Sequence, residues 1–468
     1  MTLGEFAARV AAGLPYKPNG QQSLLIEALA RFCSPAQYDA GARDRVFMLN
    51  GYAGTGKTSI VGALVKALAE VRIATELLAP TGRAAKVFGA YAGTPAHTIH
   101  RRIYRHSLHG ETPGLRDNNC RDTIFIVDEA SMIAGDDGAA ASVLTDLIHF
   151  VYGAPGCRMI LVGDTAQLPP VGSDFSQAMD AGVLRGYGLA VTRVTLTETA
   201  RQQAFSGILA NATWQRRAMR AEKIPLPRIF TDDYDDVNVV TPEDLFEAID
   251  TAYREDGVAQ TIVITRSNRR AVDFNRAIRN EVLYNEEAVC QGELLMVAKN
   301  NYFWSRRVKG LGFVANGDIV VVERVHGTET RYGMSFADVT LTLSDRDVSF
   351  DAKIMLDTLQ SDAAAVPAEK MRTLYEALMT DPDLFPLGMP FDERARALRD
   401  NPYWNALQVK YAYAVTCHKA QGGQWKHVVV DMLSIAPEAV GVEFYRWLYT
   451  ATTRARTTLT FVCSEQED

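Results

Sequence analysis

A glycine-rich octapeptide, Gly51 to Thr58, constrains the fold of this chain more than any other segment. Its sequence, GYAGTGKT, fits the pattern GxxxxGK[ST] at every fixed position. It directly follows the apolar run VFMLN and directly precedes SIVGALVKALAE, which is a strand–loop–helix setting. Glycines let such a loop curl until several backbone N–H groups point inward at a helix N-terminus, where they can hold phosphates. The octapeptide therefore predicts a nucleoside triphosphate site on an α/β fold.

Two side chains of the octapeptide have specific expected roles. Lys57 would reach the β- and γ-phosphates, and the hydroxyl of Thr58 would bind Mg²⁺. The full set of expected nucleotide-binding residues in this loop is Gly51, Ala53, Gly54, Thr55, Gly56, Lys57 and Thr58.

An acidic pair follows a second apolar run, TIFIVDE (123–129). Asp128 stands at the end of this expected strand, where enzymes with such a loop hold Mg²⁺ through a carboxylate. The neighbouring Glu129 can then orient or deprotonate the attacking water. A glutamate at this position favours hydrolysis of ATP over mere storage of the nucleotide.

Apolar runs of this kind recur in two groups along the chain. The first group is 46–50, 75–79, 123–129 and 158–164, and the second is 261–267, 410–416, 427–432 and 458–463. Continuous apolar strands separated by helical stretches indicate parallel sheets covered by helices on both faces. The sequence therefore predicts two α/β units of similar kind.

The region between about residues 300 and 350 has a different pattern. It contains the turn signal Asn316-Gly317, followed by segments that alternate apolar and polar residues. We interpret it as a small antiparallel barrel inserted in the second α/β unit. The charged segment that follows, at about 357–408, is expected to be helical.

Composition excludes several classes of protein. Of 468 residues, 47% are hydrophobic and 22% are charged, which argues against a disordered, collagen-like or coiled-coil chain. No apolar run approaches the ~18 residues that span a bilayer, and the first residues do not resemble a signal peptide. The six scattered cysteines include no CxxC pair, so we expect reduced thiols in a cytoplasmic protein. The net charge of -7 means that any nucleic acid would be bound through a local basic channel.

Further blocks of sequence carry a family resemblance. The run GDTAQLPPVG (163–172) closely resembles motif III of superfamily 1 helicases. The blocks APTGRAA (79–85), HTIH (97–100), TETARQ (197–202), TCHKAQG (416–422) and LYTATTRAR (448–456) resemble other motifs of superfamily 1B, in the family's order. With the octapeptide and the acidic pair, the chain resembles the RecD-like, Pif1-like and Dda-like group over almost its entire length.

The resemblance implies an α/β architecture of two RecA-like P-loop domains, with an SH3-like β-barrel inserted in the second. The first domain would cover 1–195, the second 196–300 and 409–468, and the barrel with its helical segment 301–408. An insertion near 103–121 would be a hairpin pin that splits the duplex, for which a plain surface loop is the alternative.

The resemblance also implies roles at the nucleotide. Gln167 would sense the γ-phosphate or the attacking water through hydrogen bonds. Arg201 and Arg454 would supply positive charge to the transition state from across a cleft. Gln22 would read the edge of the adenine, with Gln21 as the alternative.

Single strands are bound by polar groups that follow the backbone and by aromatic faces that stack on bases. The matching positions in the first unit are Pro80, Thr81, Gly82, Arg83, His97, Thr98 and His100. Those in the second unit are Arg266, Asn268, Thr416, His418 and Lys419.

The expected function is that of an ATP-dependent DNA helicase, with ATP and Mg²⁺ as cofactors. The resemblance implies 5′→3′ movement on single-stranded DNA, unwinding at junctions with duplex, a monomer, no membrane association, and partners in repair or replication. Two alternatives stay open: a RecD-like motor subunit active only within a nuclease complex, and a nucleotide-dependent switch that binds protein instead of DNA. Stimulation of the ATPase by DNA, followed by an unwinding assay, would separate them.

Overall fold

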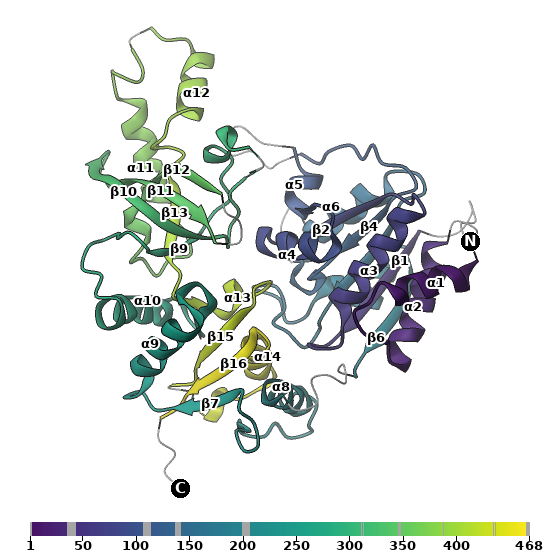
Figure 1. The fold of residues 1–468 in the computed structure, drawn as a ribbon. Helices are drawn as coiled ribbons and strands as arrows, with labels where there is room; N and C mark the ends of the chain where they lie inside the picture. The colour runs from purple at the N-terminus through teal and green to yellow at the C-terminus, as the bar shows by residue number, and fades with distance from the viewer. Residues whose placement is uncertain are drawn as a thin grey trace. The chain divides into compact units, whose positions relative to one another are not determined.

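The computed structural model describes residues 2–34, 44–105, 114–135, 142–198, 206–309, 311, 313–344, 348–386, 388–433, 435 and 437–464. The chain divides into two compact units (Figure 1). The first unit comprises 1–236, 421–423 and 436–453, and the second comprises 237–420, 424–435 and 454–468. These units are defined by packing, whereas the boundaries expected at 195, 300 and 408 refer to the domains of a family, so those boundaries stay a prediction.

The first unit contains a parallel sheet of six strands in the order β3-β2-β4-β5-β1-β6. The strands are β1 (Arg45–Gly51), β2 (Thr75–Ala79), β3 (Ala96–Thr98), β4 (Ile124–Val127), β5 (Arg158–Gly163) and β6 (Ala190–Leu196). The four apolar runs of the first group form β2, β4, β5 and β1, side by side, as predicted. The outer strands β3 and β6 were missed because β3 has three residues and β6 is partly exposed, so neither forms a continuous apolar run.

Both faces of this sheet are buried, which explains its unbroken apolar runs. In β1, Phe47 and Leu49 belong to the core shared with α1 (Leu3–Ala12), α2 (Gly20–Cys33) and α3 (Lys57–Glu70). The alternate residues Val46 and Met48 belong to the core on the other face, shared with α5 (Ile99–Ile103), α6 (Val143–Tyr152) and α7 (Ala181–Gly186). The helix α4 (Gly82–Ala92) contributes Phe88 to the first of these cores.

Two more helices of the first unit come from distant parts of the chain. The helix α8 (Gly207–Ala218) packs against α14 (Val442–Thr452). The rings of Trp214 and Tyr445 meet edge to face at 5.6 Å, and Gln215 Nε2 donates a buried hydrogen bond to Thr452 Oγ1 at 3.1 Å. A helix close to the C-terminus therefore completes the unit that begins at the N-terminus.

The second unit contains a parallel sheet in the order β14-β8-β15-β16-β7. Its strands are β7 (Val237–Val240), β8 (Thr261–Thr265), β14 (Ala414–Thr416), β15 (Trp425–Asp431) and β16 (Ala455–Val462). Its helices are α9 (Leu245–Asp256), α10 (Asn268–Ala277) and α13 (Cys417–Ala420). A second α/β layer, predicted from the recurring apolar runs, is thus confirmed.

The predicted barrel is also confirmed, as a closed barrel in the order β10-β11-β12-β13-β9. Its strands are β9 (Leu294–Val297), β10 (Ile319–Arg331), β11 (Met334–Leu343), β12 (Ser349–Met355) and β13 (Leu407–Tyr411). The helices α11 (Ala368–Met379) and α12 (Phe391–Arg399) lie between β12 and β13 in the chain, where a helical segment was expected. Within the residues described, every helix is too short or too polar to cross a lipid bilayer.

The run 410–416 is not the single strand that was predicted. It is split between β13 of the barrel and β14 of the sheet. The side chain of Asn275 explains the split, because its Oδ1 accepts from the backbone N–H of Tyr413 at 3.0 Å and of Ala414 at 2.9 Å. Its Nδ2 donates to the carbonyl oxygen of Ala414 at 2.8 Å. This amide takes over the backbone bonds at the point where the chain leaves the barrel.

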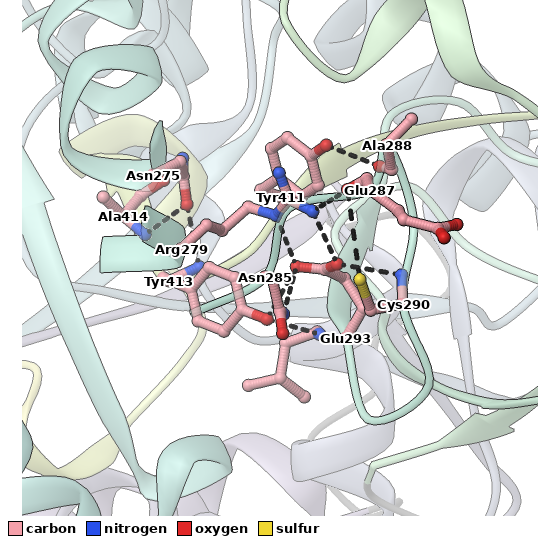
Figure 2. Close-up of polar contacts among 11 residues, drawn as sticks. Asn275, Arg279, Asn285, Glu287, Ala288, Cys290, Glu293, Tyr411, Tyr413 and Ala414 are labelled. Carbon is pink, nitrogen blue, oxygen red and sulfur yellow. Dashed lines mark hydrogen bonds and ion pairs between the residues drawn. The ribbon is translucent and has the colours of Figure 1, made fainter. Parts of the chain in front are cut away.

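A buried polar cluster lies at this crossing (Figure 2), and we call it the joint: Asn275, Arg279, Glu293, Tyr411 and Tyr413. Arg279, in the π-helical turn Ile278–Val282, donates from Nε to Glu293 Oε1 at 2.9 Å, with side-chain exposures of 6% and 0%. Tyr413 Oη donates to the same oxygen at 2.9 Å, and the Tyr411 ring lies 4.3 Å from the guanidinium. No buried side-chain nitrogen or oxygen of these five residues lacks a hydrogen-bond partner.

Candidate nucleotide site and nucleic-acid interface

The octapeptide forms the loop between β1 and α3. Gly54 and Gly56 have φ values of 73° and 84°, in the left-handed region that glycine adopts without strain. Gly56 also has no room for a side chain, because a Cβ there would collide with the hydroxyl of Tyr16 and lie 2.8 Å from Gln22 Nε2. Since α3 begins at Lys57, the loop delivers its backbone to a helix N-terminus, as the motif requires.

The side chain of Lys57 folds back over this loop. Its ammonium donates to the carbonyl oxygens of Gly51 and, at 3.0 Å, of Tyr52. The hydroxyl of Thr55 donates to the carbonyl oxygen of Tyr52 at 2.7 Å. Hydrogen bonds within the loop therefore stabilise its curled conformation, and the ammonium of Lys57 takes part in them.

The two N-terminal glutamines have protein partners. Gln22 is buried, and its amide accepts from Asn19 N at 3.0 Å and donates to the carbonyl oxygen of Thr55 at 2.9 Å. It thus ties the start of α2 to the phosphate loop. Gln21 Oε1 accepts from Thr197 N at 2.9 Å. Contact with adenine stays a prediction for either residue.

The acidic pair lies at the carboxyl end of β4. Asp128 is partly buried, and its desolvation, followed by the charge of Glu129, raises the pKa of its carboxyl to about 7. Its Oδ1 accepts from the backbone N–H of Glu129 at 2.9 Å. Glu129 has a φ of 50°, a left-handed conformation that costs a non-glycine residue about 1 kcal/mol or more. Such strain next to a partly buried carboxylate is typical of functional sites.

Two buried side-chain atoms in the segments after β4 and β5 have no hydrogen-bond partner among the described residues. They are Ser131 Oγ and Gln167 Oε1. Buried polar atoms are nearly always paired, so an unpaired one is a place where a bound group can supply the missing bond. With the carboxylate of Asp128, these atoms fit a site for a nucleotide with its cation.

The segment around Gln167 is held by residues from near the C-terminus. Asp164 Oδ2 accepts from Tyr449 Oη at 2.7 Å, and the same hydroxyl accepts from the backbone N–H of Ala53 at 2.8 Å. Thr450 Oγ1 accepts from Leu168 N at 2.9 Å. The carbonyl oxygen of Leu168 accepts from Gln421 Nε2 at 3.0 Å.

Sequence reasoning did not select these anchoring residues. Asp164, Gln421, Tyr449 and Thr450 all lie inside the quoted blocks, so their position in those blocks was the available signal.

Tyr52 of the loop is covered by arginines of the α8 region, which sequence reasoning also missed. The guanidinium of Arg216 lies 3.9 Å from the centre of the Tyr52 ring, and Arg220 donates to the Tyr52 hydroxyl. Neither arginine lies in a recognisable motif, so no sequence signal pointed to them. They add positive charge beside the phosphate loop.

The two arginines expected at the transition state are placed differently. Arg201 lies outside the described residues. Arg454 is buried in the second unit, and its carbonyl oxygen accepts from Trp425 N at 3.0 Å. It follows α14 by two positions in the chain. The roles of both arginines stay predictions.

The residues expected to contact DNA in the first unit gather at the carboxyl ends of β2 and β3. These neighbouring strands end opposite each other, with Ala79 paired to Thr98. Thr81 caps α4 by accepting from Ala84 N at 3.2 Å, and Thr98 likewise caps α5. Pro80 precedes Thr81 in the bend between β2 and α4, and Gly82 and Arg83 are the first two residues of α4.

Two histidines lie near this edge of the sheet, His97 in β3 and His100 in α5. Burial lowers the pKa of His97, with a further contribution from the charge of Arg101, and burial lowers the pKa of His100. Both imidazoles are therefore favoured in the neutral form, which can donate one hydrogen bond and accept another.

The expected pin is described only at its base. Tyr104 and Leu115 form an antiparallel bridge, and Arg105 N donates to the carbonyl oxygen of Gly114 at 2.8 Å. Residues 106–113 lie outside the described residues, so hairpin pin and surface loop stay open as interpretations.

The second unit repeats the arrangement of the first at β8 and β14. These strands also end opposite each other, with Thr416 paired to Thr265. Arg266, Asn268 and His418 follow the two strand ends and are exposed. In each unit, the structure brings the residues predicted to contact DNA to the carboxyl ends of two neighbouring strands.

A narrow cleft at this edge is lined by Asn268, Thr416 and Lys419, together with Lys410 of β13. Lys410 Nζ donates to the carbonyl oxygen of Ser361 at 2.6 Å. Burial, followed by the charge of Lys419, lowers the pKa of Lys410 to about 8. Asp362 lines the same cleft and its charge opposes this shift, so the cleft holds two partly buried lysines and one carboxylate.

Comparison with known proteins adds independent evidence. Residues 35–226 match the family model of an AAA domain, and residues 411–462 match that of a UvrD-like helicase C-terminal domain. The first match includes the phosphate loop and the acidic pair. The second includes β14, α14 and Arg454.

Individual relatives agree with these matches. The chain is 35% identical over 179 residues to the ATP-dependent RecD2 DNA helicase of Deinococcus radiodurans, a stretch that covers 37% of this chain and 22% of that protein. It is 20% identical over 516 residues to the uncharacterized protein R530 of Acanthamoeba polyphaga mimivirus, covering 95% and 99% of the two chains. The matched part thus spans only about a fifth of the RecD2 relative.

A solved structure shows the same fold. The Pif1 helicase from Bacteroides, in complex with ADP-AlF3 and single-stranded DNA, superposes with a TM-score of 0.52 at 14% identity. The superposition covers 96% of this chain and 94% of that one.

The phosphate loop, the acidic pair and the two parallel sheets define a P-loop protein with an α/β fold. These comparisons agree with the resemblance to the RecD-like and Pif1-like group, because one match is to a helicase domain, one stretch is similar to a RecD2 helicase, and the fold is similar to that of a Pif1 helicase. The resemblance expected from the sequence motifs is confirmed.

Proposed function

We propose that this protein is an ATP-dependent DNA helicase, which hydrolyses ATP at the phosphate loop, moves along single-stranded DNA and unwinds duplex. One observation carries the proposal. The phosphate loop and Asp128 follow β1 and β4, while the turns expected to contact DNA follow β2 and β3 of the same parallel sheet. Carboxyl ends of parallel strands share one edge, so nucleotide and DNA would meet one rigid element.

At the nucleotide, the loop amides and Lys57 bind the phosphates. The ammonium of Lys57 then gives up its hydrogen bonds to carbonyl oxygens of the loop and donates to phosphate oxygens instead. Glu129 accepts the proton of the attacking water. Gln167 directs its unpaired Oε1 to that water, while Arg201 and Arg454 supply positive charge. Gln22 holds the loop, and its amide or that of Gln21 meets the adenine.

Mg²⁺ fits the residues that surround the loop. Asp128 is a partly buried carboxylate whose pKa is raised by desolvation, and a divalent cation would stabilise its charged form. We propose that Asp128 and the hydroxyl of Thr58 hold the ion. When bound, it neutralises negative charge on the phosphates. Among the described residues, no three His, Cys, Asp or Glu side chains form a metal cluster.

We propose that the DNA strand contacts Pro80–Arg83 and His97–His100 in the first unit. In the second unit it contacts Arg266, Asn268, Thr416, His418 and Lys419. Hydrolysis would alternate the strength of these two sets of contacts, which is what translocation requires. The active species is a monomer, since one chain carries both sets. Movement in the 5′→3′ direction and partners in repair or replication follow from the group resemblance.

The test uses the full chain in two assays. In the first, ATP turnover is measured with and without a single-stranded oligonucleotide, and we expect strong stimulation by the oligonucleotide. Turnover that is indifferent to DNA would favour the nucleotide switch.

In the second assay, duplexes with a 5′ or a 3′ single-stranded tail are offered as substrates, and we expect unwinding of the 5′-tailed duplex. DNA-stimulated turnover without unwinding of either duplex would favour a motor subunit that needs a partner.

A further inference from the structure

The segment that carries Gln167 is anchored on both sides. Asp164 lies three positions before Gln167, and its carboxylate accepts from Tyr449 Oη at 2.7 Å and from Ala166 N at 3.0 Å. Leu168 follows Gln167, and its backbone N–H is bound by Thr450 at 2.9 Å. Between these anchors, Gln167 Oε1 is buried and has no hydrogen-bond partner among the described residues.

The Tyr449 hydroxyl reaches the phosphate loop as well. It accepts from the backbone N–H of Ala53 at 2.8 Å while it donates to Asp164. Burial, followed by the charge of Asp164, raises the pKa of Tyr449 well above its ordinary value. The hydroxyl is therefore protonated throughout the neutral range, and it can act as donor and acceptor at once.

A buried hydroxyl with two such bonds fixes the distance between the groups it joins. Here those groups are the backbone of the phosphate loop and the start of the Gln167 segment. Thr450, the next residue on α14, fixes the other end of that segment. An active-site group is effective only if its neighbours hold it within a fraction of an ångström of the productive position.

We propose that Tyr449 and Thr450 are positioning residues for ATP hydrolysis: they hold Gln167 at a fixed place relative to the phosphate loop. The inference rests on the proposed function, in which Gln167 acts on the γ-phosphate or its water. Beyond that function, we infer that α14 fixes the position of Gln167. The hydroxyl of Tyr449 binds one end of the segment that carries Gln167, and the hydroxyl of Thr450 binds the other end.

The primary variant is Tyr449→Phe, which removes one oxygen atom and leaves the ring in place. A misplacement of about 1 Å costs about 10²-fold in rate, so we expect kcat for ATP to fall about 10–100-fold. The dissociation constant of a fluorescent ATP analogue should change less than about threefold, because most loop contacts to the phosphates remain. Tyr445→Phe is the matched control, since that hydroxyl lies one turn earlier on α14 and donates to the Pro225 carbonyl oxygen at 2.8 Å.

A double-mutant cycle with Gln167→Ala separates positioning from a general structural role. If Tyr449 acts through Gln167, then Tyr449→Phe should cause no further loss of kcat in the Gln167→Ala background. Additive losses, or an equal loss in Tyr445→Phe, would overturn the proposal. Wild-type turnover in Gln167→Ala alone would contradict the role proposed for Gln167, which is a different failure.

Thr450 gives a second test that does not depend on the folding of the tyrosine variant. Thr450→Val keeps the shape and removes the acceptor for Leu168 N, so kcat should fall while the affinity for the ATP analogue is kept. Thr450→Ser restores the acceptor and should restore kcat. If Val and Ser variants have the same kcat, Thr450 does not position Gln167.

Discussion

In two buried clusters of this protein, a tyrosine hydroxyl donates a hydrogen bond to a carboxylate. The clusters differ in whether all of their buried side-chain polar atoms have a hydrogen-bond partner. In the joint, Tyr413 binds Glu293 and no buried side-chain polar atom of the cluster lacks a partner. Beside the phosphate loop, Tyr449 binds Asp164, but Gln167 Oε1 and Ser131 Oγ have no partner among the described residues. A fully paired network fixes structure, whereas unused hydrogen-bonding capacity marks a place for a ligand.

The two regions also differ in whether a carboxylate has an opposite charge beside it. Glu293 meets the guanidinium of Arg279 within hydrogen-bond distance, so its buried charge is balanced inside the protein. Asp128 has Glu129 as its neighbour, and burial together with that like charge raises its pKa to about 7. The charge of Glu293 is balanced by Arg279, whereas the charge of Lys57 only partly offsets the effects of desolvation and of Glu129 on Asp128. The comparison predicts that changes in one region act on stability and changes in the other on turnover.

The largest effect is expected from Lys57→Ala. Removal of the ammonium from the phosphate loop should lower ATP turnover about 10³-fold, since it takes away charge that stabilises the transition state. The melting temperature should stay within about 2 °C of wild type, because the lysine bonds only to loop carbonyls, a loss of well under 1 kcal/mol. Lys66→Ala, at an exposed position of the same helix, is the control. Near-wild-type turnover in the folded Lys57 variant would remove the loop from the active site.

Glu129→Gln should lower hydrolysis at least about 10²-fold, because an amide cannot accept the proton of the attacking water. Binding of ATP and of single-stranded DNA should persist, and both can be measured by fluorescence titration of the same preparation. If ATP binding is lost instead, the carboxylate is chiefly a metal or structural group.

Glu293→Gln tests the expectation that changes in the joint act on stability and not on turnover. It leaves the Arg279 guanidinium buried without its counter-ion, which costs about 3–5 kcal/mol, so the urea midpoint of the second unit should fall clearly. Below the unfolding transition, kcat should stay within about twofold of wild type, well short of the losses that follow removal of a catalytic group. Asp400→Asn is the control, since it breaks the exposed Arg306–Asp400 pair, worth less than about 1 kcal/mol. A large loss of kcat in Glu293→Gln would show that the joint takes part in catalysis.

The smallest effect concerns Lys410, the residue next to the joint along β13. Burial lowers its pKa to about 8 from an ordinary value of 10.5, so between these pH values the unfolded chain holds a proton that the folded protein lacks. Stability should therefore rise with pH over this window. Lys410→Met should melt higher than wild type below pH 8, and the difference should shrink as the pH approaches 10. A constant difference would show that Lys410 is not buried enough to titrate early.

The parts of the molecule that could be predicted are those set by local sequence. The phosphate loop and the buried strands depend on glycines and apolar runs within a few positions of each other, and the structure places them as expected. The split of 410–416 depends on the side chain of Asn275, which no pattern within the run reveals. The bond between Tyr449 and Asp164 joins residues 285 positions apart, so only the folded chain shows it. The features that could not be predicted therefore depend on side-chain hydrogen bonds between residues that are far apart in the sequence.

The origin of α14 has a consequence for synthesis of the protein. The ribosome completes the six strands of the first sheet when residue 196 is made, but α14 begins at Val442. Until that helix emerges, Asp164 and the backbone of Ala53 lack the hydroxyl that joins them. A nascent chain thus has the phosphate loop early and α14 late, so under the positioning role proposed for Tyr449 it would hydrolyse ATP more slowly than the folded chain. At about 5–20 residues per second, α14 is made many seconds after the last strand of the first sheet.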